Sequence, residues 1–353
     1  INVGALFAPT AAIKIMEWSQ QSLGVSEEDS YHFAFAVACV SLIVSICIYY
    51  GFKSTFQQVL NVKKSDGAKV QSSNEQELSK SETIERIVCL VLVYAVVIFF
   101  WMAFHQNGAT LTFFARDYVA TSATGVTAMA FDVTNLLLCI VIVYGLFGIF
   151  QSKSVSHKGI WGAVIAAAVA FLGYKYLHTE EVSVSAPIFQ QFNPCFVVAL
   201  TPVSIALFGW LAKKGKEPKA PVKIGLGMLV AALAYLLMTI MSVGLPAPNA
   251  ESPEHLADVS PNILVSTYLI LTFAELLLSP IGIAFVTKVA PPKFKGMMMG
   301  GWFVATALGN FLVSIPTILW GMDLYVVWGT LMCICLVAAL FIFSIIKKLN
   351  RVA

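Results

Sequence analysis

One acidic residue, Glu275, lies near the centre of the apolar run from Asn262 to Thr287. Apart from Tyr268, it carries the only ionisable side chain of that run. A carboxylate at the centre of a membrane-spanning helix costs at least ~2.5 kcal/mol on an insertion scale, and such acids commonly line a pathway for protons or charged solutes. Glu275 is therefore a candidate site for a positively charged group that crosses a membrane.

Further polar side chains interrupt the apolar runs at helical spacing. Glu275 and Ser279 are four residues apart, so they share one face of a helix. An acid would bind an ammonium group, nearby amides would bond a backbone-like group, and an indole would form a wall for side chains. An acid, amides and an indole together predict a cavity for a zwitterionic or cationic solute. The other residues of this kind are Asn2, His105, Gln106, Asn193, Trp302 and Asn310.

Structural roles are the alternative for each of these residues. Asn193 and Asn310 could simply bond neighbouring helices, and Trp302 could serve packing. His105 lies at the outer end of its apolar run, where a solvated histidine is common. Glu275 could belong to an internal ion pair, but no lysine or arginine of this chain lies at a matching depth. A cationic partner would have to come from outside the chain.

The composition is that of a polytopic membrane protein. The chain has 353 residues, of which 58% are hydrophobic and 12% charged, whereas a soluble domain carries about 25% charged residues. Hydropathy predicts ten membrane-spanning segments, the first of them weak or truncated. Their approximate limits are 1–16, 33–52, 84–106, 127–150, 159–177, 190–212, 223–244, 262–287, 296–320 and 324–346.

Lysine and arginine gather in every second loop, which sets the expected orientation. Five segments hold 19 of the 22 basic residues: 53–86, 151–158, 213–223, 288–295 and 347–353. The positive-inside rule places these loops and the C-terminus in the cytoplasm. The basic run 213–223 is flanked by apolar spans, so it is interpreted as a topology determinant rather than a nucleic-acid site.

Local signals add three expectations. The chain begins at Ile1 with a short apolar run and no signal peptide, so it is interpreted as the later part of a longer protein. The polar stretch 61–83 is typical of a flexible linker. Pro194, Pro202 and Pro280 are expected to kink their helices around a central cavity.

Residues 268–310, YLILTFAELLLSPIGIAFVTKVAPPKFKGMMMGGWFVATALGN, resemble the signature of the proton-dependent oligopeptide transporters. That signature has a tyrosine, a glutamate, Ser-Pro-x-Gly, Ala-Pro, a glycine-methionine cluster, a tryptophan and Gly-Asn. Three shorter runs resemble the start of the family's fifth helix, its seventh helix and the Asn-Pro element of its eighth. They are INVGALFAPT at 1–10, FFWMAFHQNGATLTFFA at 99–115 and FNPCF at 192–196.

The resemblance implies an all-α major-facilitator bundle with about ten of its helices in this chain. It implies a symporter of di- and tripeptides that is driven by the proton gradient and works by alternating access. Glu275 would bind the peptide amino terminus, Asn2 and Asn193 would hold backbone groups, and Trp302 would line a side-chain pocket near Ser279. Gln106 joins this substrate-binding set, and Glu275 and His105 are the candidates for proton coupling or gating.

The sequence departs from the family pattern in three ways. The first four helices are absent, and with them a Glu-x-x-Glu-Arg element, so this chain alone is not expected to transport. His105-Gln106 stands where the family usually has Glu-Gln, and a histidine there would respond to pH near ~6.5. An extra apolar pair follows the His105 helix. The expected parts are 1–52 (last two helices of the first bundle), 53–83 (cytoplasmic linker), 84–126 (first helix of the second bundle and outer loop), 127–177 (peripheral hairpin) and 178–353 (five remaining helices).

Other function classes remain as alternatives. One is a related carrier of another peptide-like or anionic solute, and another is a peptide-binding membrane protein that does not transport. A membrane-embedded enzyme is disfavoured because no Gly-x-Ser-x-Gly, His-Glu-x-x-His or metal-spaced cluster is present. The expected partners are a di- or tripeptide, protons and lipid, with no metal, cofactor or nucleic acid. A monomer in the inner (plasma) membrane is expected.

Overall fold

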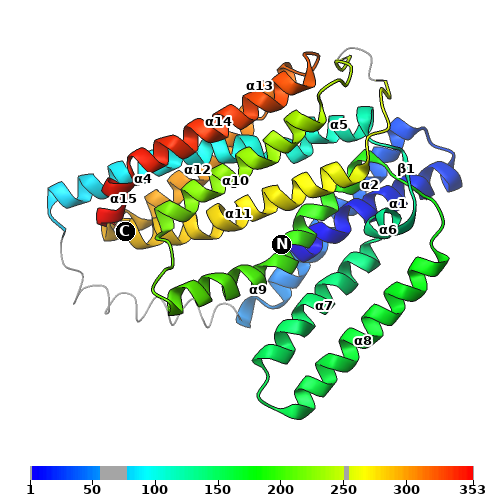
Figure 1. Ribbon diagram of the computed structural model, residues 1–353, viewed down its shortest axis with the longest axis horizontal. Coiled ribbons are helices and arrows are strands. Elements are labelled where there is room, and N and C mark those ends of the chain that lie inside the picture. The colour runs from blue at the N-terminus through cyan, green and yellow to red at the C-terminus, as the bar shows by residue number, and fades with distance from the viewer. Residues whose placement is uncertain (1, 56–77, 250–253, 353) are drawn as a thin grey trace.

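The protein is an all-α bundle with one two-stranded sheet, and the structure, a computed structural model, describes residues 2–55, 78–249 and 254–352 (Figure 1). Nine helical stretches in the described ranges are long and apolar enough to cross a membrane. The long helices are α1 (Asn2–Leu23), α2 (Glu27–Gly51), α4 (Lys80–Phe104), α7 (Val133–Gln151), α8 (Val155–His178), α9 (Phe192–Lys213), α10 (Ala220–Met241), α11 (Pro261–Val289), α12 (Lys295–Leu312) and α14 (Leu324–Ser344).

Shorter elements join these helices. They are η1 (His105–Gly108), α5 (Thr110–Tyr118), β1 (Ser122–Ala123), α6 (Gly125–Ala130), β2 (Val182–Ser183), η2 (Ala186–Gln191), η3 (Pro292–Phe294), α13 (Ser314–Ile318) and α15 (Ile346–Val352). The strands β1 and β2 pair antiparallel, with Ser122 opposite Ser183. The ten predicted segments coincide with the ten long helices, but α1 is not among the nine stretches of sufficient hydropathy.

Polar residues fix where several helices begin. Ser79 and Glu82 form a capping box at the start of α4, and Ser26 accepts a hydrogen bond from the Asp29 N–H at the start of α2. Pro261 occupies the first position of α11, where a missing N–H costs nothing. Each cap satisfies backbone donors that a helix end otherwise leaves unpaired. The helix limits therefore extend the apolar runs by a few capped residues.

The core lies where the later helices pack together. α10 packs between α11 and α14, and α4 packs chiefly on α12. α1 packs against α2, α9 and η2, so it lies beside the part of the chain that carries Asn193. The basic ends of α9 and α15 and the start of α4 lie at one end of the molecule, while β1, α5 and α6 lie at the other (Figure 1).

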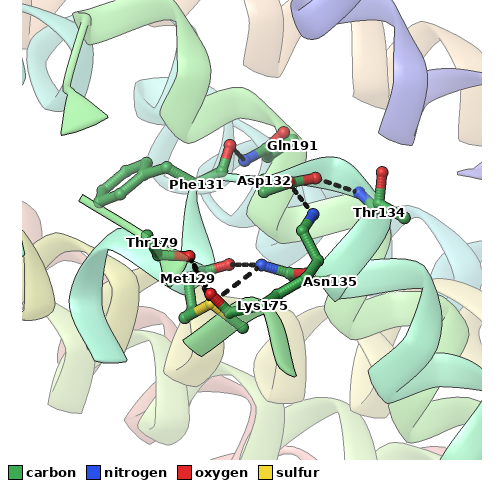
Figure 2. A network of polar contacts seen from close by, with 8 residues as sticks. All are labelled: Met129, Phe131, Asp132, Thr134, Asn135, Lys175, Thr179 and Gln191. Atoms are coloured by element: carbon green, nitrogen blue, oxygen red, sulfur yellow. Dashed lines mark hydrogen bonds and ion pairs between the residues drawn. The ribbon is translucent and has the colours of Figure 1, made fainter. Parts of the chain in front are cut away.

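The helices α7 and α8 form a hairpin that packs on the remainder mainly through α7 and α9. Its base is held by polar contacts (Figure 2). Asp132 caps α7 by accepting the Thr134 N–H at 2.7 Å, and the same carboxylate pairs with Lys175 of α8. The Gln191 amide donates to the Phe131 carbonyl at 3.4 Å, which ties the hairpin to η2.

Two local expectations differ from the structure. The range 107–126, predicted as an outer loop, contains α5, because the amphipathic run after Gly108 covers the core with Leu111 and Phe114. Pro194 does not kink α9, since it is the third residue of that helix, where its missing N–H has no intrahelical partner. Pro202 and Pro280 do lie inside α9 and α11. Of the predicted linker 53–83, residues 56–77 lie outside the described residues.

Candidate substrate-binding site

Glu275 of α11 and Asn193 of α9 meet inside the helix bundle. The Asn193 side-chain amide donates to Oε2 of Glu275 at 3.0 Å and lies 3.1 Å from Oγ1 of Thr272. Thr272 precedes Glu275 by three residues, so both lie on the helix face that α9 contacts. Among the residues that the structure describes, no lysine, arginine or histidine pairs with Glu275. The acid has a neutral partner, and its charge is free for a cation.

The hydrogen bonds continue from this pair along α11. Oγ1 of Thr272 donates to the Tyr268 carbonyl at 2.8 Å. The Tyr268 hydroxyl then donates to the Asn107 carbonyl in η1 at 3.0 Å. The side chains at positions 268, 272 and 275 share one face of α11. This face therefore contacts both α9, through Asn193, and η1, through the Asn107 carbonyl.

The Asn107 carbonyl accepts from three donors because the helix is broken there. α4 ends at Phe104, a single 3-10 turn follows, and Ala109 adopts φ −130° and ψ −105° before α5 begins. The carbonyl therefore has no regular helical donor. It accepts from Tyr268, from Nε2 of Gln190 at 2.5 Å and from Oγ1 of Thr112 at 2.7 Å. Such satisfied breaks are tolerated at membrane depth only inside protein or at a cavity.

Trp302 lies against Gly282 and is 2% exposed. A methyl group in place of the glycine hydrogen would come within 2.2 Å of the indole, so the glycine makes room for the ring between α11 and α12. The indole therefore serves packing in this conformation, and its role as the wall of a side-chain pocket stays a prediction. Ser279, one turn after Glu275, is half-buried and also belongs to α11.

Gln106 and His105 lie in the broken segment, and among the described residues no hydrogen bond joins either of them to Glu275. The Gln106 amide donates to the carbonyls of Met102 at 3.1 Å and Val313 at 3.2 Å, and its oxygen accepts from Thr110. The ring of His105 stacks on Trp101, with centroids 4.8 Å apart, and Asn310 lies beside it.

One nitrogen of the His105 ring has no hydrogen bond to the described residues. Nδ1 of His105 is shielded from solvent and has no hydrogen-bond partner among residues 2–55, 78–249 and 254–352. Asn2 is half-buried in the first turn of α1, and no hydrogen bond joins its side chain to Glu275 or Asn193 in the described part of the chain. Of the predicted substrate-binding residues, Asn193 and Glu275 are joined by a hydrogen bond in the described part of the chain.

Sequence reasoning missed the polar residues that connect the site to the helix break. Thr272 was detectable, because it lies three residues before the acid and so shares its face. Gln190 and Thr112 meet only through the non-helical geometry of Asn107, which no periodicity encodes. Within the described ranges, no group of three or more metal-binding side chains comes together.

Comparisons with known proteins show what this chain is similar to. Residues 175–320, which contain Asn193, Glu275 and Trp302, match the family model described as the POT family. The peptide transporter YePEPT of Yersinia enterocolitica subsp. palearctica is 26% identical over 331 residues, covering 89% of this chain and 58% of that protein. The di-/tripeptide transporter of Lactococcus lactis is 23% identical, covering 86% and 57%. The chain thus spans somewhat more than half the length of these relatives.

Solved structures show the same fold. A crystal structure of a mutant POT peptide transporter in complex with alafosfalin matches with a TM-score of 0.63 and 18% identity, covering 100% of this chain and 66% of that one. A POT family transporter in complex with 5-aminolevulinic acid matches with a TM-score of 0.57 and 16% identity, covering 99% and 67%. With the family model and the relatives, these likenesses lead to one conclusion: residues 175–320 match the POT family, and the chain has the fold of POT peptide transporters.

Proposed function

We propose that the protein that contains this chain is a proton-coupled symporter of di- and tripeptides. The observation that carries the proposal is the contact between Asn193 and Glu275, an amide and an acid on two membrane-spanning helices with no cation beside them in the described structure. An ionised acid in the interior of a membrane protein costs free energy, and such acids commonly have a function. The names of the relatives, peptide transporter and di-/tripeptide transporter, supply the cargo that has an ammonium group for it.

Glu275 can act in both halves of a transport cycle. When it is ionised, it attracts the amino terminus of a peptide, while Asn193 keeps one of its oxygens fixed. When it takes up a proton, that attraction is lost and the peptide can leave. Release of the peptide is thus linked to proton uptake by Glu275. Symport also requires a group that carries a proton together with the peptide, and we propose His105 for that role.

Alternating access would use the irregular points of the helices. The break at 105–109 joins α4 to α5, and Pro280 lies five residues after Glu275 in α11. Both sites lack a regular backbone hydrogen bond, so bending there costs less than elsewhere. We place His105 at the first break as a second proton-binding group, and Asn2, Gln106, Ser279 and Trp302 as residues that meet the peptide in other states of the cycle.

The proposed orientation follows from charge. The lysines and arginines at the ends of α9 and α11 and in α15 would face the cytoplasm, with the C-terminus. Residues 1–52 would close the first bundle, 84–126 and 178–353 would form the second, and 127–177 would lie at its periphery. A monomer in the inner membrane fits this arrangement.

Uptake of a labelled dipeptide by the full-length protein in proteoliposomes tests the proposal. Glu275→Gln keeps the shape and the contact with Asn193 but removes the charge, so proton-driven uptake should fall at least tenfold. Glu181→Gln, which removes an exposed acid between α8 and β2, should leave uptake unchanged. Counterflow exchange without a proton gradient separates a loss of binding from a loss of coupling.

Two results would contradict the proposal. Uptake by the Glu275→Gln variant at the wild-type rate would remove the acid from the mechanism. Wild-type uptake that is suppressed by an excess of an anion such as nitrate, but unaffected by unlabelled dipeptides, would favour a carrier of another solute.

A further inference from the structure

An apolar groove runs between α4 and α14 on the outside of the bundle. α4 packs chiefly on α12 and α14 chiefly on α10, so these two helices meet only along one edge. The space left between them has a volume of 440 Å³, which lies within the range of roughly 300–1,000 Å³ of small-molecule sites. All of its lining side chains are apolar. They include Ala95, Val96 and Phe99 of α4 and Cys333, Val337 and Ala338 of α14.

The groove lies at membrane depth, because both helices are membrane-spanning stretches. Val337 is 65% exposed and Cys333 is exposed as well, so the groove opens toward the surrounding lipid. Small side chains at Ala95 and Ala338 leave the depression between the helices. A flexible hydrocarbon chain fits a narrow, apolar groove of this kind, since no polar atom of a ligand would find a partner there.

Basic residues lie near the end of α14, to which this groove extends. Phe341, which also lines it, lies within one helical turn of Ser344, the last residue of α14. The next helix, α15, packs on α4 and α14, and its own residue Leu349 is fully buried. Figure 1 shows α15 and the start of α4 at this same end of the molecule.

Positive charge outweighs negative charge at this end. The basic residues of the start of α4 and of α15 are Lys80, Arg86, Lys347, Lys348 and Arg351, against the acids Glu82 and Glu85. Arg351 lies 3.4 Å from Glu85, and Arg86 donates to the Val289 carbonyl at 3.2 Å. Lys347 and Lys348 are exposed and form no ion pair with a described residue. Two exposed lysines without an ion pair among the described residues thus lie in α15, the helix that follows the groove-lining helix α14.

We propose that this groove and the lysine pair form a binding site for one anionic phospholipid. An acyl chain occupies the groove between α4 and α14, and the phosphate of the headgroup binds Lys347 and Lys348. Basic pockets at the ends of membrane helices bind anionic headgroups in this way, at ~1 kcal/mol for each lysine near the surface. The proposed lipid site shares no residue with the peptide site, because Glu275 and Asn193 belong to α11 and α9.

Native mass spectrometry of the full-length protein measures this binding. We expect phosphatidylglycerol to bind more tightly than phosphatidylcholine of the same chain length. Lys347→Gln with Lys348→Gln should weaken phosphatidylglycerol binding about 30-fold and leave phosphatidylcholine binding unchanged. The matched control is Lys213→Gln with Lys214→Gln, which removes two exposed lysines at the end of α9, away from the groove, and should not change either affinity at this site.

A second pair of variants tests the groove itself. Val337→Phe fills it from its exposed rim with little risk to folding, and Ala95→Leu fills it from the other side. Each should weaken the binding of both lipids while size-exclusion chromatography shows a folded, monodisperse protein. Equal wild-type affinity for the two lipids, wild-type binding by the double lysine variant, or wild-type binding by folded Val337→Phe would overturn the proposal.

Discussion

The side-chain amide of Asn193 donates to Oε2 of Glu275 at 3.0 Å, across the contact between α9 and α11. This hydrogen bond orients the carboxylate without neutralising it. A lysine or arginine in the same place would hold the acid in a permanent ion pair, and a cargo would have to displace it. An amide partner leaves the negative charge available, which a site for an ammonium group requires.

Replacing Asn193 with alanine should therefore weaken peptide binding. The carboxylate would lose its fixed position, and a hydrogen bond to a charged group contributes about 1.5–3 kcal/mol. In the full-length protein we expect the KM for a dipeptide to rise about 10- to 100-fold. The matched control is Asn262→Ala at the start of α11, which removes an exposed amide that bonds Thr127.

The ratio of the KM of Asn193→Ala to the KM of Asn262→Ala tests whether Asn193 takes part in peptide binding. A KM for Asn193→Ala within twofold of that of Asn262→Ala would mean that the amide only joins α9 to α11. Thermal unfolding of both variants serves as the check that either protein is folded.

The membrane helices and the acid within one of them could be predicted because their signals are local. A run of about 20 apolar residues has few alternatives to a spanning helix, and an acid inside such a run is conspicuous. The hairpin formed by α7 and α8 also follows from two such runs joined by a short polar turn. The element limits moved by a few residues where Ser79 and Asp132 cap helices.

The partners of the site residues could not be predicted, because they depend on how helices turn toward one another. Trp302 packs on Gly282 in this conformation, and only the missing side chain of that glycine makes the contact possible, while its place in a pocket wall stays a prediction. Asn107 acts through its carbonyl, which exists as a free acceptor only because α4 ends just before it. Neither backbone groups nor absent side chains leave a periodic trace in a sequence.

Gly282→Ala should destabilise the protein. Its methyl carbon would lie 2.2 Å from the Trp302 ring, so the indole or α11 must shift, and overpacking of this kind costs about 1–3 kcal/mol. Gly300→Ala in α12 is the control, because nothing lies within 4 Å of its added carbon and alanine favours a helix by up to ~1 kcal/mol. Thermal unfolding in detergent should show a lower Tm for the first variant and an equal or higher Tm for the second. Equal Tm values for Gly282→Ala and wild type would mean that the indole is not held there.

Tyr268→Phe should loosen the break between α4 and α5. The variant removes one of three donors to the Asn107 carbonyl, so the expected loss is about 0.5–1.5 kcal/mol, the net value of one hydrogen bond. Amide hydrogen exchange should speed up in residues 105–112 and remain unchanged in α14. Tyr144→Phe, which removes an exposed hydroxyl that bonds the Val198 carbonyl, should not change exchange in residues 105–112. Unchanged exchange at the break in Tyr268→Phe would show that the other two donors suffice.

The ion pair at the base of the hairpin should make stability depend on pH. Burial of Asp132 opposes its ionisation, but hydrogen bonds from Lys175 and the Thr134 N–H outweigh that effect, so its pKa is lower in the folded protein. A carboxylate with a pKa lowered by folding adds stability above its unfolded pKa of about 3.9 and loses it as the pH falls through the folded pKa. Because the pair is partly exposed, we expect its contribution to be about 1 kcal/mol or less.

Asp132→Asn keeps a side chain that can cap α7 but removes the charge, so it isolates this contribution. Its unfolding temperature should lie below that of wild type at pH 7, and the two should converge as the pH falls below about 4. Once Lys175→Met has removed the partner, Asp132→Asn should have a much smaller effect, because the two residues contribute together. Glu181→Gln, an exposed acid nearby in the chain, should show no such convergence. Additive effects of Asp132→Asn and Lys175→Met would mean that α7 and α8 are joined by packing alone.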